Sequence, residues 1–357
     1  NNLQGSTSRT LWPGASLNLN WNTKWGYNQN TTITTDGDGI VTQGDVLSTF
    51  SRSRSYLSLP DWFIFSAFDN DIEGVVDEYA RRKSELPVPQ LPANPTGADS
   101  ITYGQALVAY NKQITSILSE TFEQQLEALN WLPGNLGKYL PRVNWQFTWN
   151  GLEKLPFFTG WLSSASLRHT YTGKFTYNYR ATPDGEVPET QTVTRGFSPL
   201  AQLNVTGKDE VFGGSATGSI SYNTTTDFVL VTAARSEISK EVKNEATLQL
   251  NYRKRGFSFP LFGLKLQNEI EFQTNFSYSR NNRKRFNLTD FKPEGNNNGS
   301  TKISFRPSIR YSISNAVDGL AFISYDATIP DEEGSREISR STTKVGIEIR
   351  LRISGGR

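Results

Sequence analysis

Cysteine and methionine are absent from the 357 residues, and histidine occurs only once, as His169. The lack of cysteine excludes disulfide scaffolds, cysteine-ligated metal sites and thiol catalysis. The single histidine excludes metal sites built on histidine pairs and leaves a serine triad as the only histidine-based form of catalysis. Because the chain starts at Asn1 and has no methionine, we expect a processed chain, a piece of a longer one, or a sequence inferred indirectly.

Long hydrophobic runs are also missing, and the net charge is only +2. No run of about 18 apolar residues occurs, which excludes a transmembrane helix. The small net charge gives no reason to expect nucleic acid as a partner. The mean hydropathy of −0.51 is typical of a water-soluble protein. A membrane β-barrel is also hydrophilic on average, because only alternate residues face lipid, so composition leaves barrels open.

Alternation of apolar and polar residues with a period of two is the main pattern in the chain. It is clearest over 344–353, 302–313 and 166–179. These runs are much longer than the roughly five or six residues of an ordinary strand, and a tilted strand needs about 9–11 residues to cross a bilayer. The polar positions carry arginine, lysine, glutamate, asparagine and threonine, which suits a wet lumen. We predict an all-β fold, a transmembrane antiparallel β-barrel of roughly ten to twelve strands in this chain. The alternative is a large soluble β-sandwich or β-helix.

The apolar members of the alternating runs are the predicted lipid-facing positions. They are Trp145, Phe147, Trp149, Leu167, Tyr171, Phe175, Tyr177, Leu248, Leu250, Phe272, Phe276, Ile303, Phe305, Ile309, Val345, Ile347, Ile349 and Leu351.

Residues 69–142 interrupt the strand pattern. Asp71 to about Leu86 predicts a short amphipathic helix, and 104–130 predicts a longer one with apolar residues every three or four positions. A proline-rich connector separates the two. We therefore expect barrel strands in 1–68 and 143–357, and a small helical insert in 69–142 that packs on the barrel rim as an extracellular cap.

Link lengths between the expected strands suggest an orientation. A bacterial barrel has its C-terminus and its short turns in the periplasm and its longer loops outside. On this basis the links 181–195 and 281–300 lie outside, and the links 151–163 and 255–263 lie inside. Each outer link is at least as long as the next inner one, which favours a barrel.

Several segments resemble, in order, the motifs of one family. Val143–Phe158 resembles P-N-W-x-x-x-Y-x-G-L-x-K-[IL]-P, and Ser166–Phe175 resembles L-x-H-x-Y-x-S-x-Y, with Gly173 at the serine position. Phe197–Lys208 resembles F-S-P-L-x-x-x-x-x-T-x-K, and Lys302–Tyr311 resembles K-x-I-S-x-x-P-S-I-x-Y. Trp12–Ala15 matches W-P-G-A. The ordered set is similar to the SprA/Sov family, the outer-membrane translocons of the type IX secretion system in Bacteroidota.

This resemblance implies a protein-conducting channel in the bacterial outer membrane that exports folded cargo, is linked to gliding motility, and is not an enzyme. It implies no cofactor. The chain would be the C-terminal portion of a very large barrel closed by its N-terminal remainder. The implied partners are a PorV-like shuttle barrel, a periplasmic plug protein and secreted cargo. A porin or TonB-dependent channel, and a soluble extracellular β-rich adhesin, remain as alternatives.

Three further sites have a plain reading beside a functional one. His169 lies on the apolar side of its strand, which favours a structural histidine among aromatic rings. The segment 36–39 (Asp-Gly-Asp-Gly) is similar to the start of a calcium loop, but its continuation favours a hairpin turn. A basic cluster at the start of the long outer link could contact lipopolysaccharide phosphates, or could be a solvated loop base. Its members are Arg280, Arg283, Lys284 and Arg285.

Overall fold

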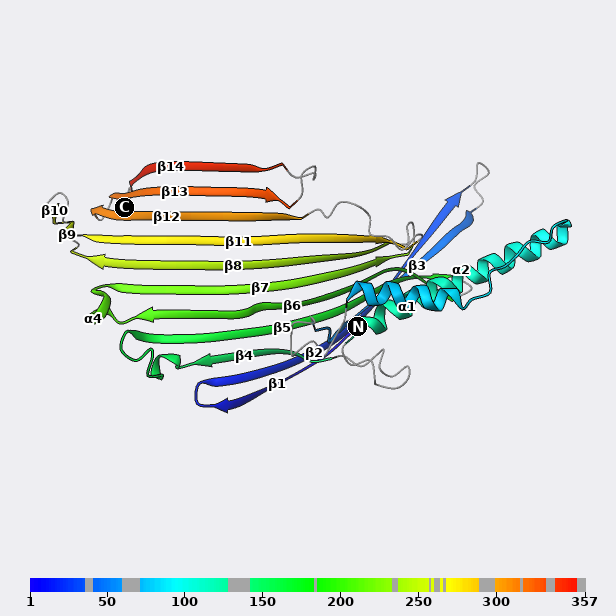
Figure 1. The fold of residues 1–357 in the computed structure, drawn as a ribbon, viewed down its shortest axis with the longest axis horizontal. Helices are drawn as coiled ribbons and strands as arrows, with labels where there is room; N and C mark the ends of the chain where they lie inside the picture. The colour runs from blue at the N-terminus through cyan, green and yellow to red at the C-terminus, as the bar shows by residue number, and fades with distance from the viewer. Residues whose placement is uncertain are drawn as a thin grey trace.

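The chain forms one large antiparallel sheet with a helical insert in the computed structural model (Figure 1). The structure describes residues 1–35, 41–59, 71–127, 142–182, 185–232, 237–256, 258–259, 264–265, 268–288, 299–314, 317–331 and 338–351. Strands make up 66% of the chain and helices are few, which confirms the all-β prediction.

The elements follow one another in a simple order along the chain. They are β1 (Asn2–Trp12), β2 (Ala15–Thr35), β3 (Val41–Ser55), α1 (Ile72–Ser84), α2 (Gly97–Gln125), β4 (Asn144–Asn150), the 3₁₀ helix η1 (Leu152–Lys154), β5 (Leu162–Thr182), β6 (Gly185–Gly207), α4 (Asp209–Phe212), β7 (Ser215–Val231), β8 (Glu237–Arg255), β9 (Ser258–Phe259), β10 (Leu264–Lys265), β11 (Glu269–Asn287), β12 (Ser300–Ser314), β13 (Val317–Pro330) and β14 (Arg340–Leu351).

The main sheet has 12 strands in the order β1-β2-β3-β5-β6-β7-β8-β11-β12-β13-β14, with β4 beside β2 and β5. This number agrees with the roughly ten to twelve strands expected from the alternating runs. Neighbours in the sheet are neighbours in the chain, which is the simplest antiparallel arrangement. Among the described residues β1 pairs only with β2 and β14 only with β13, so the sheet does not close on itself.

The strands extend further than their apolar residues indicate, and this overturns the argument from link lengths. The expected outer link 181–195 lies mostly in β5 and β6 and shrinks to 183–184, shorter than the inner link 151–161. β11 likewise takes up 281–287. Polar residues continue the ladders past the apolar part, so the sequence alone places the strand ends too early. The link lengths do not fix the orientation.

β3 and β4 share one place in the sheet, end to end, between β2 and β5. Arg54 pairs with Thr23 of β2, and Asn144 pairs with Asn20 of the same strand. The two ends are joined directly, since Arg142 N–H donates to the Ser55 carbonyl over 2.9 Å. A single strand is therefore interrupted, and the helical insert leaves and re-enters the sheet at this break. The insert starts after Ser55, earlier than the predicted boundary at 68; residues 60–70 lie outside the described residues.

The two helices of the insert begin at side-chain caps. Asp71 caps α1, and Thr96 and Asp99 form a capping box at the start of α2. The second helix begins at Gly97, before the predicted start at 104, because the capping box of Thr96 and Asp99 stabilises its first turn. α2 ends at Gln125, and the predicted end at 130 lies outside the described residues.

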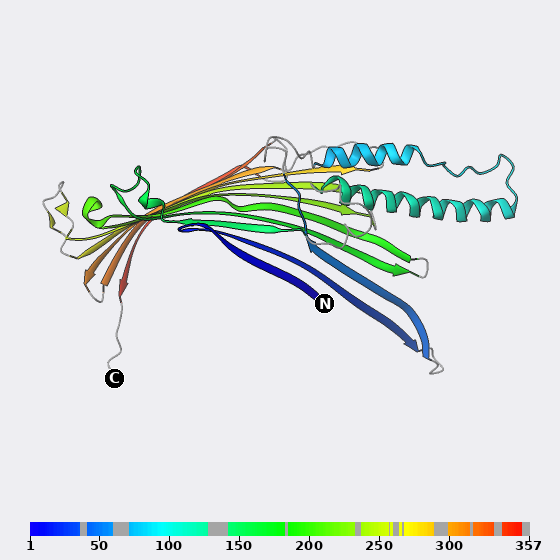
Figure 2. The same cartoon turned by 90° about the horizontal axis from the view of Figure 1, so that it is seen from below.

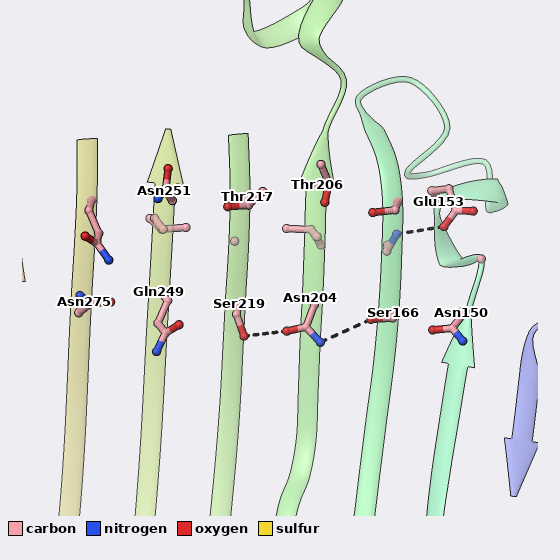
Figure 3. A pocket seen from close by; sticks show the side chains of 17 residues that line it. Asn150, Glu153, Ser166, Asn204, Thr206, Thr217, Ser219, Gln249, Asn251 and Asn275 are labelled. Carbon is pink, nitrogen blue, oxygen red and sulfur yellow. Dashed lines mark hydrogen bonds between the residues drawn. The ribbon is translucent and has the colours of Figure 1, made fainter. Parts of the chain in front are cut away.

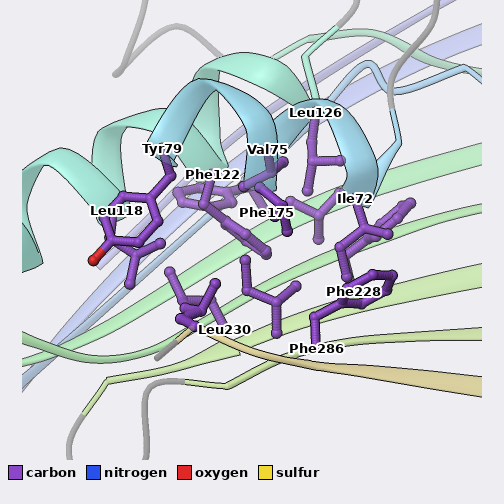
Figure 4. Close-up of a cluster of buried hydrophobic side chains, with 14 of the residues drawn as sticks. Ile72, Val75, Tyr79, Leu118, Phe122, Leu126, Phe175, Phe228, Leu230 and Phe286 are labelled. Atoms are coloured by element: carbon purple, nitrogen blue, oxygen red, sulfur yellow. The ribbon is translucent and has the colours of Figure 1, made fainter. Parts of the chain in front are cut away.

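The insert packs on one face of the sheet, and the two edges of the sheet bend to the other side (Figure 2). Its buried side chains, among them Ile72, Val75, Leu118 and Phe122, meet Phe175 and apolar residues of the neighbouring strands β6, β7, β8 and β11 (Figure 4). This is the main hydrophobic core of the described residues. The insert thus covers part of the outer side of the bend, and its expected role as an extracellular cap stays a prediction.

Candidate functional site

One face of the sheet carries a continuous row of apolar side chains in register across six strands. The row consists of Leu203, Ile220, Leu248, Phe276, Phe305 and Tyr325. The registers place all the predicted lipid-facing positions on this same face, from Trp149 in β4 to Ile347 in β14. No residue of the described chain covers its C-terminal part, where even central-strand residues such as Ile220 and Leu250 are 53% and 48% exposed.

Two of the predicted lipid-facing residues are covered by the chain itself. Phe175 lies in the core beneath the insert, and Tyr171 donates a hydrogen bond from its hydroxyl to the Ser58 carbonyl over 2.9 Å. Both are at most 1% exposed. Tyr177 is partly buried against the same core. The prediction of lipid contact is therefore wrong for Tyr171 and Phe175, because alternation gives the face of a residue but not what covers that face.

The apolar face forms a band of limited height. On β11 its apolar residues run from Ile270, which is 6% exposed, to Tyr278, and the next residues on that face are Arg280 and Asn282. At about 3.4 Å per residue the band measures about 27 Å along the strand, or about 20 Å across a bilayer for a strand tilted by about 40°. This compares well with the apolar belt of about 25 Å on membrane barrels.

The opposite face is polar and contains a shallow hollow of about 660 Å³ (Figure 3). Its floor is a row of amide and hydroxyl side chains in register on neighbouring strands: Ser166, Asn204, Ser219, Gln249 and Asn275. Ser219 donates to Asn204 over 2.9 Å, and Asn204 donates to Ser166 over 3.4 Å. Glu153 at the rim accepts a hydrogen bond from the Ala165 N–H. The hollow offers hydrogen-bonding groups to water or to a polar surface.

Charged residues on the polar face are joined across the strands. Arg253 of β8 and Arg310 of β12 both contact Glu271 of β11, at 3.0 and 3.7 Å. Arg306 and Asp326 form a further pair at 3.0 Å. A face this rich in charged and amide groups cannot pack into an apolar core at low cost, because each buried polar group would need a partner. It is a face suited to water.

His169 lies where the sequence predicted, among aromatic rings on the apolar face. Its Nε2 accepts a hydrogen bond from the Trp145 indole N–H over 3.1 Å. Its Nδ1 therefore carries the proton and donates to the Leu200 carbonyl at 2.6 Å. Both ring nitrogens have structural partners, so the geometry supports a structural role.

The predicted lipopolysaccharide cluster is divided between the two faces. All four residues lie inside β11, so Arg280 and Lys284 point to the apolar side, and Arg283 and Arg285 point to the polar side. Each of three also has an acidic neighbour: Arg280 contacts Asp331, Lys284 approaches Glu73, and Arg285 contacts Glu237. The predicted cluster therefore does not form one basic site.

A buried ionic group holds the insert to the break in the sheet. Arg54, which is 1% exposed, contacts Glu123 at 3.1 Å and Glu127 at 3.3 Å. Arg142, on the returning chain, contacts Glu127 at 2.8 Å. Two cations and two carboxylates thus balance each other where β3 ends and β4 begins. No pattern in the sequence points to this group, since Arg54 lies far from the other three members in the chain.

Ion pairs also link successive turns of α1. Glu78 accepts hydrogen bonds from Arg81 and Arg82, and these bonds lower its pKa to about 2. The pairs lie at helical spacing on a solvent-facing side.

No helix among the described residues is long and apolar enough to cross a membrane. Within the same residues no cluster of three or more acidic, histidine or cysteine side chains could hold a metal ion. The segment 36–39, with its resemblance to a calcium loop, lies outside the side chains that the structure describes. No protein-family model matches the chain, and no curated protein is found to be related to it.

Proposed function

We propose that this chain is part of the wall of a large outer-membrane β-barrel that conducts folded proteins, a translocon of the SprA type in the type IX secretion system. The observation that carries this proposal is the uncovered apolar band on β7–β14, directly behind a polar face. Water-soluble proteins rarely expose apolar patches larger than a few hundred Å². A bilayer on one side and an aqueous lumen on the other account for both faces at once.

The open edges support a barrel larger than this sheet. Within the part of the chain that the structure describes, β1 and β14 each have one neighbour, and the outward residues of β14, such as Val345 and Ile347, are 74% and 81% exposed. In a bilayer every backbone N–H and C=O must be paired, so a wall with two free edges needs further strands. The N-terminal remainder of the same barrel is the proposed source of those strands.

The choice of a translocon over a porin or a TonB-dependent channel rests on the ordered motifs of the resemblance. On this proposal the polar face lines the path of secreted cargo proteins, a PorV-like shuttle barrel receives them, and a periplasmic plug closes the empty channel. The amide and hydroxyl floor of the hollow is compatible with such a path, because its side chains can hydrogen-bond to water and carry little charge to retain a passing surface.

Fractionation tests the membrane proposal first. We expect the full-length natural protein to be found in the outer-membrane fraction, to require detergent for extraction, and to migrate faster on a gel when unheated. Recovery in the soluble fraction without detergent would overturn both the translocon and the other barrel functions.

Copurification tests the translocon itself. From detergent extracts of cells that contain the natural protein, we expect a second, smaller outer-membrane barrel to copurify in constant proportion. A detergent-extracted protein that proves complete at about this length, and that conducts small solutes alone, would instead assign the chain to passive channels.

A further inference from the structure

A hollow of about 490 Å³ lies between the start of α1 and strands β6, β7 and β8, on the same face as the apolar band. One end of this hollow is charged, with Asp71, Arg195 and Lys240, and its middle mixes polar and apolar side chains, among them Asn244, Val242 and Phe197. The other end is apolar, with Leu200 and Tyr222. Such a division fits an amphiphile better than a small polar solute.

The charged end has an excess of positive charge. Of the described residues, Arg195 and Lys240 line it against one carboxylate, Asp71. Arg195 is 5% exposed and is held by the Ser58 hydroxyl at 3.2 Å and the Leu59 carbonyl at 3.0 Å. Lys240 forms an ion pair with Asp71. These contacts fix both cations in position, so binding an anion there costs little ordering of side chains.

Two further cations lie beside the hollow on the next strand, each with an acidic neighbour of its own. Lys240 pairs in the ladder with Lys284, and Asn244 pairs with Arg280. Like charges directly opposite each other destabilise a sheet unless an opposite charge lies nearby. Burial alone would raise the pKa of Asp71, but its hydrogen bond and ion pair with Lys240 lower it, so the carboxylate stays charged in neutral solution and offsets only part of the excess.

The hollow opens directly onto the apolar band. Its polar rung pairs Thr224 with Asn244; two residues further along, Tyr222 pairs with Ala246, and after that Ile220 pairs with Leu248. A ligand whose head lies beside Lys240 would therefore have its apolar part against Leu248 and Ile220.

We propose that this hollow binds the phosphorylated head group of a membrane lipid, with the acyl chains lying along the apolar band. The inference rests on the proposed function, since it requires the band to face a bilayer. It moves the lipid contact from the divided cluster at 280–285 to the space beneath α1. The helix N-terminus is not needed as an anion site, because the Ile72 N–H already donates to Asp71.

Native mass spectrometry of the detergent-purified, full-length protein tests this site. The probes are diphosphorylated lipid A, the same lipid after removal of its phosphates, and inorganic phosphate. We expect retention of the phosphorylated lipid and about tenfold weaker binding of the dephosphorylated form, a difference of about 1.4 kcal/mol, since removal of the phosphates removes the charged partner of both cations. Equal binding of both lipids overturns the proposal. Binding of inorganic phosphate as strong as that of the lipid reassigns the hollow to a free anion and also overturns it.

Two variants and a matched control locate the binding. Lys240→Gln removes a cation and should weaken binding of the phosphorylated lipid about tenfold. Lys240→Gln also removes the ion pair with Asp71 and could act by loosening α1. Asn244→Trp fills the hollow but keeps both cations and this ion pair, so loss of binding in this variant reports on the hollow itself. Lys254→Gln alters the same face of β8 at the opposite end of the band and should bind as the natural protein does. Unchanged binding in both test variants contradicts the site.

The proposed function fails separately. A protein that is soluble without detergent removes the membrane itself. A detergent-dependent protein that retains no phosphorylated lipid contradicts the lipid site alone.

Discussion

Gly173 lies opposite the break between β3 and β4, where the chain allows no side chain. Its carbonyl accepts a hydrogen bond from the Tyr56 N–H over 2.9 Å, and its own N–H donates to Asn144 Oδ1 over 2.8 Å. A Cβ atom at this position would lie 1.9 Å from the Tyr56 carbonyl oxygen. The motif that this segment resembles has serine here, so the departure has a local steric reason.

We expect Gly173→Ser to lower the free energy of unfolding by about 1–3 kcal/mol, because the backbone of Tyr56 must move away. The measurement is the urea midpoint of the folded, heat-modifiable form in detergent. Gly74→Ala is the control, since no atom lies within 4 Å of its added Cβ and alanine favours a helix interior. A Gly173→Ser protein as stable as the control would show that the close approach is absent.

Glu127 is the acidic centre of the buried ionic group at the same break. It contacts Arg54 and Arg142, and all three side chains are at most 8% exposed. Glu127→Gln removes the carboxylate that contacts both buried guanidinium groups and leaves the contact of Arg54 with Glu123. We expect the free energy of unfolding of the insert to fall by about 3–5 kcal/mol, since removing one partner of a buried pair leaves uncompensated charge. Hydrogen exchange of the backbone amides of α1 and α2 measures this change.

Glu85→Gln provides the comparison for Glu127→Gln. Its pair with Arg81 is more than half exposed on both sides, so the expected loss is under about 1 kcal/mol. Equal effects of the two substitutions would show that the buried group does not hold the insert.

At the scale of elements, alternation in the sequence predicted the strands and the face of each residue, and apolar spacing predicted both helices. The predicted strand ends fall too early where polar side chains continue the ladder, as in β11, which runs on from Tyr278 to Asn287. The covering of Phe175 could not be predicted from its own segment, because its cover comes from α1 and α2, which precede it by tens of residues in the chain. The end-to-end arrangement of β3 and β4 cannot be predicted from their own residues. It depends on the strands with which they pair, β2 and β5.

The break in the sheet predicts that the insert can be removed. Ser55 pairs with Lys174 and Trp145 with Tyr171, which leaves room for one residue between Ser55 and Asn144, opposite Gly173. A chain with residues 56–143 replaced by one serine should still form the sheet, now with a continuous strand. It should also expose Phe175, Phe228 and Ile238, which the insert covers in the natural chain.

Two measurements check the insert-free chain. Heat-modifiable migration should persist, and binding of a fluorescent apolar dye by the protein in a mild detergent should increase. Loss of the folded form, with the natural chain folding under the same conditions, would mean that the insert is required to build the wall.

At the scale of the whole molecule, the two faces were predictable from the sequence and their surroundings were not. The polar hollow follows from amide and hydroxyl residues on alternate positions, but their alignment across strands depends on register, which bulges such as that between Phe197 and Ala201 shift. The hollow beneath α1 was missed for a similar reason. Its cations, Arg195 and Lys240, lie on different strands that are far apart in the sequence, and the sheet brings them to the same hollow.

Substitutions at two neighbouring residues of β8, one on each face of the sheet, test which face meets the bilayer. Leu248 lies in the middle of the apolar band, paired with Phe276 and Ile220, and Gln249 lies in the polar hollow beside Asn275. Arginine at the lipid-facing midplane costs about 2–4 kcal/mol, whereas a water-lined wall accepts it. We therefore expect Leu248→Arg to reduce insertion into lipid vesicles sharply and Gln249→Arg to insert as the natural protein does. The reverse order would place the bilayer on the polar face, and equal insertion of the two variants would mean that neither face meets lipid.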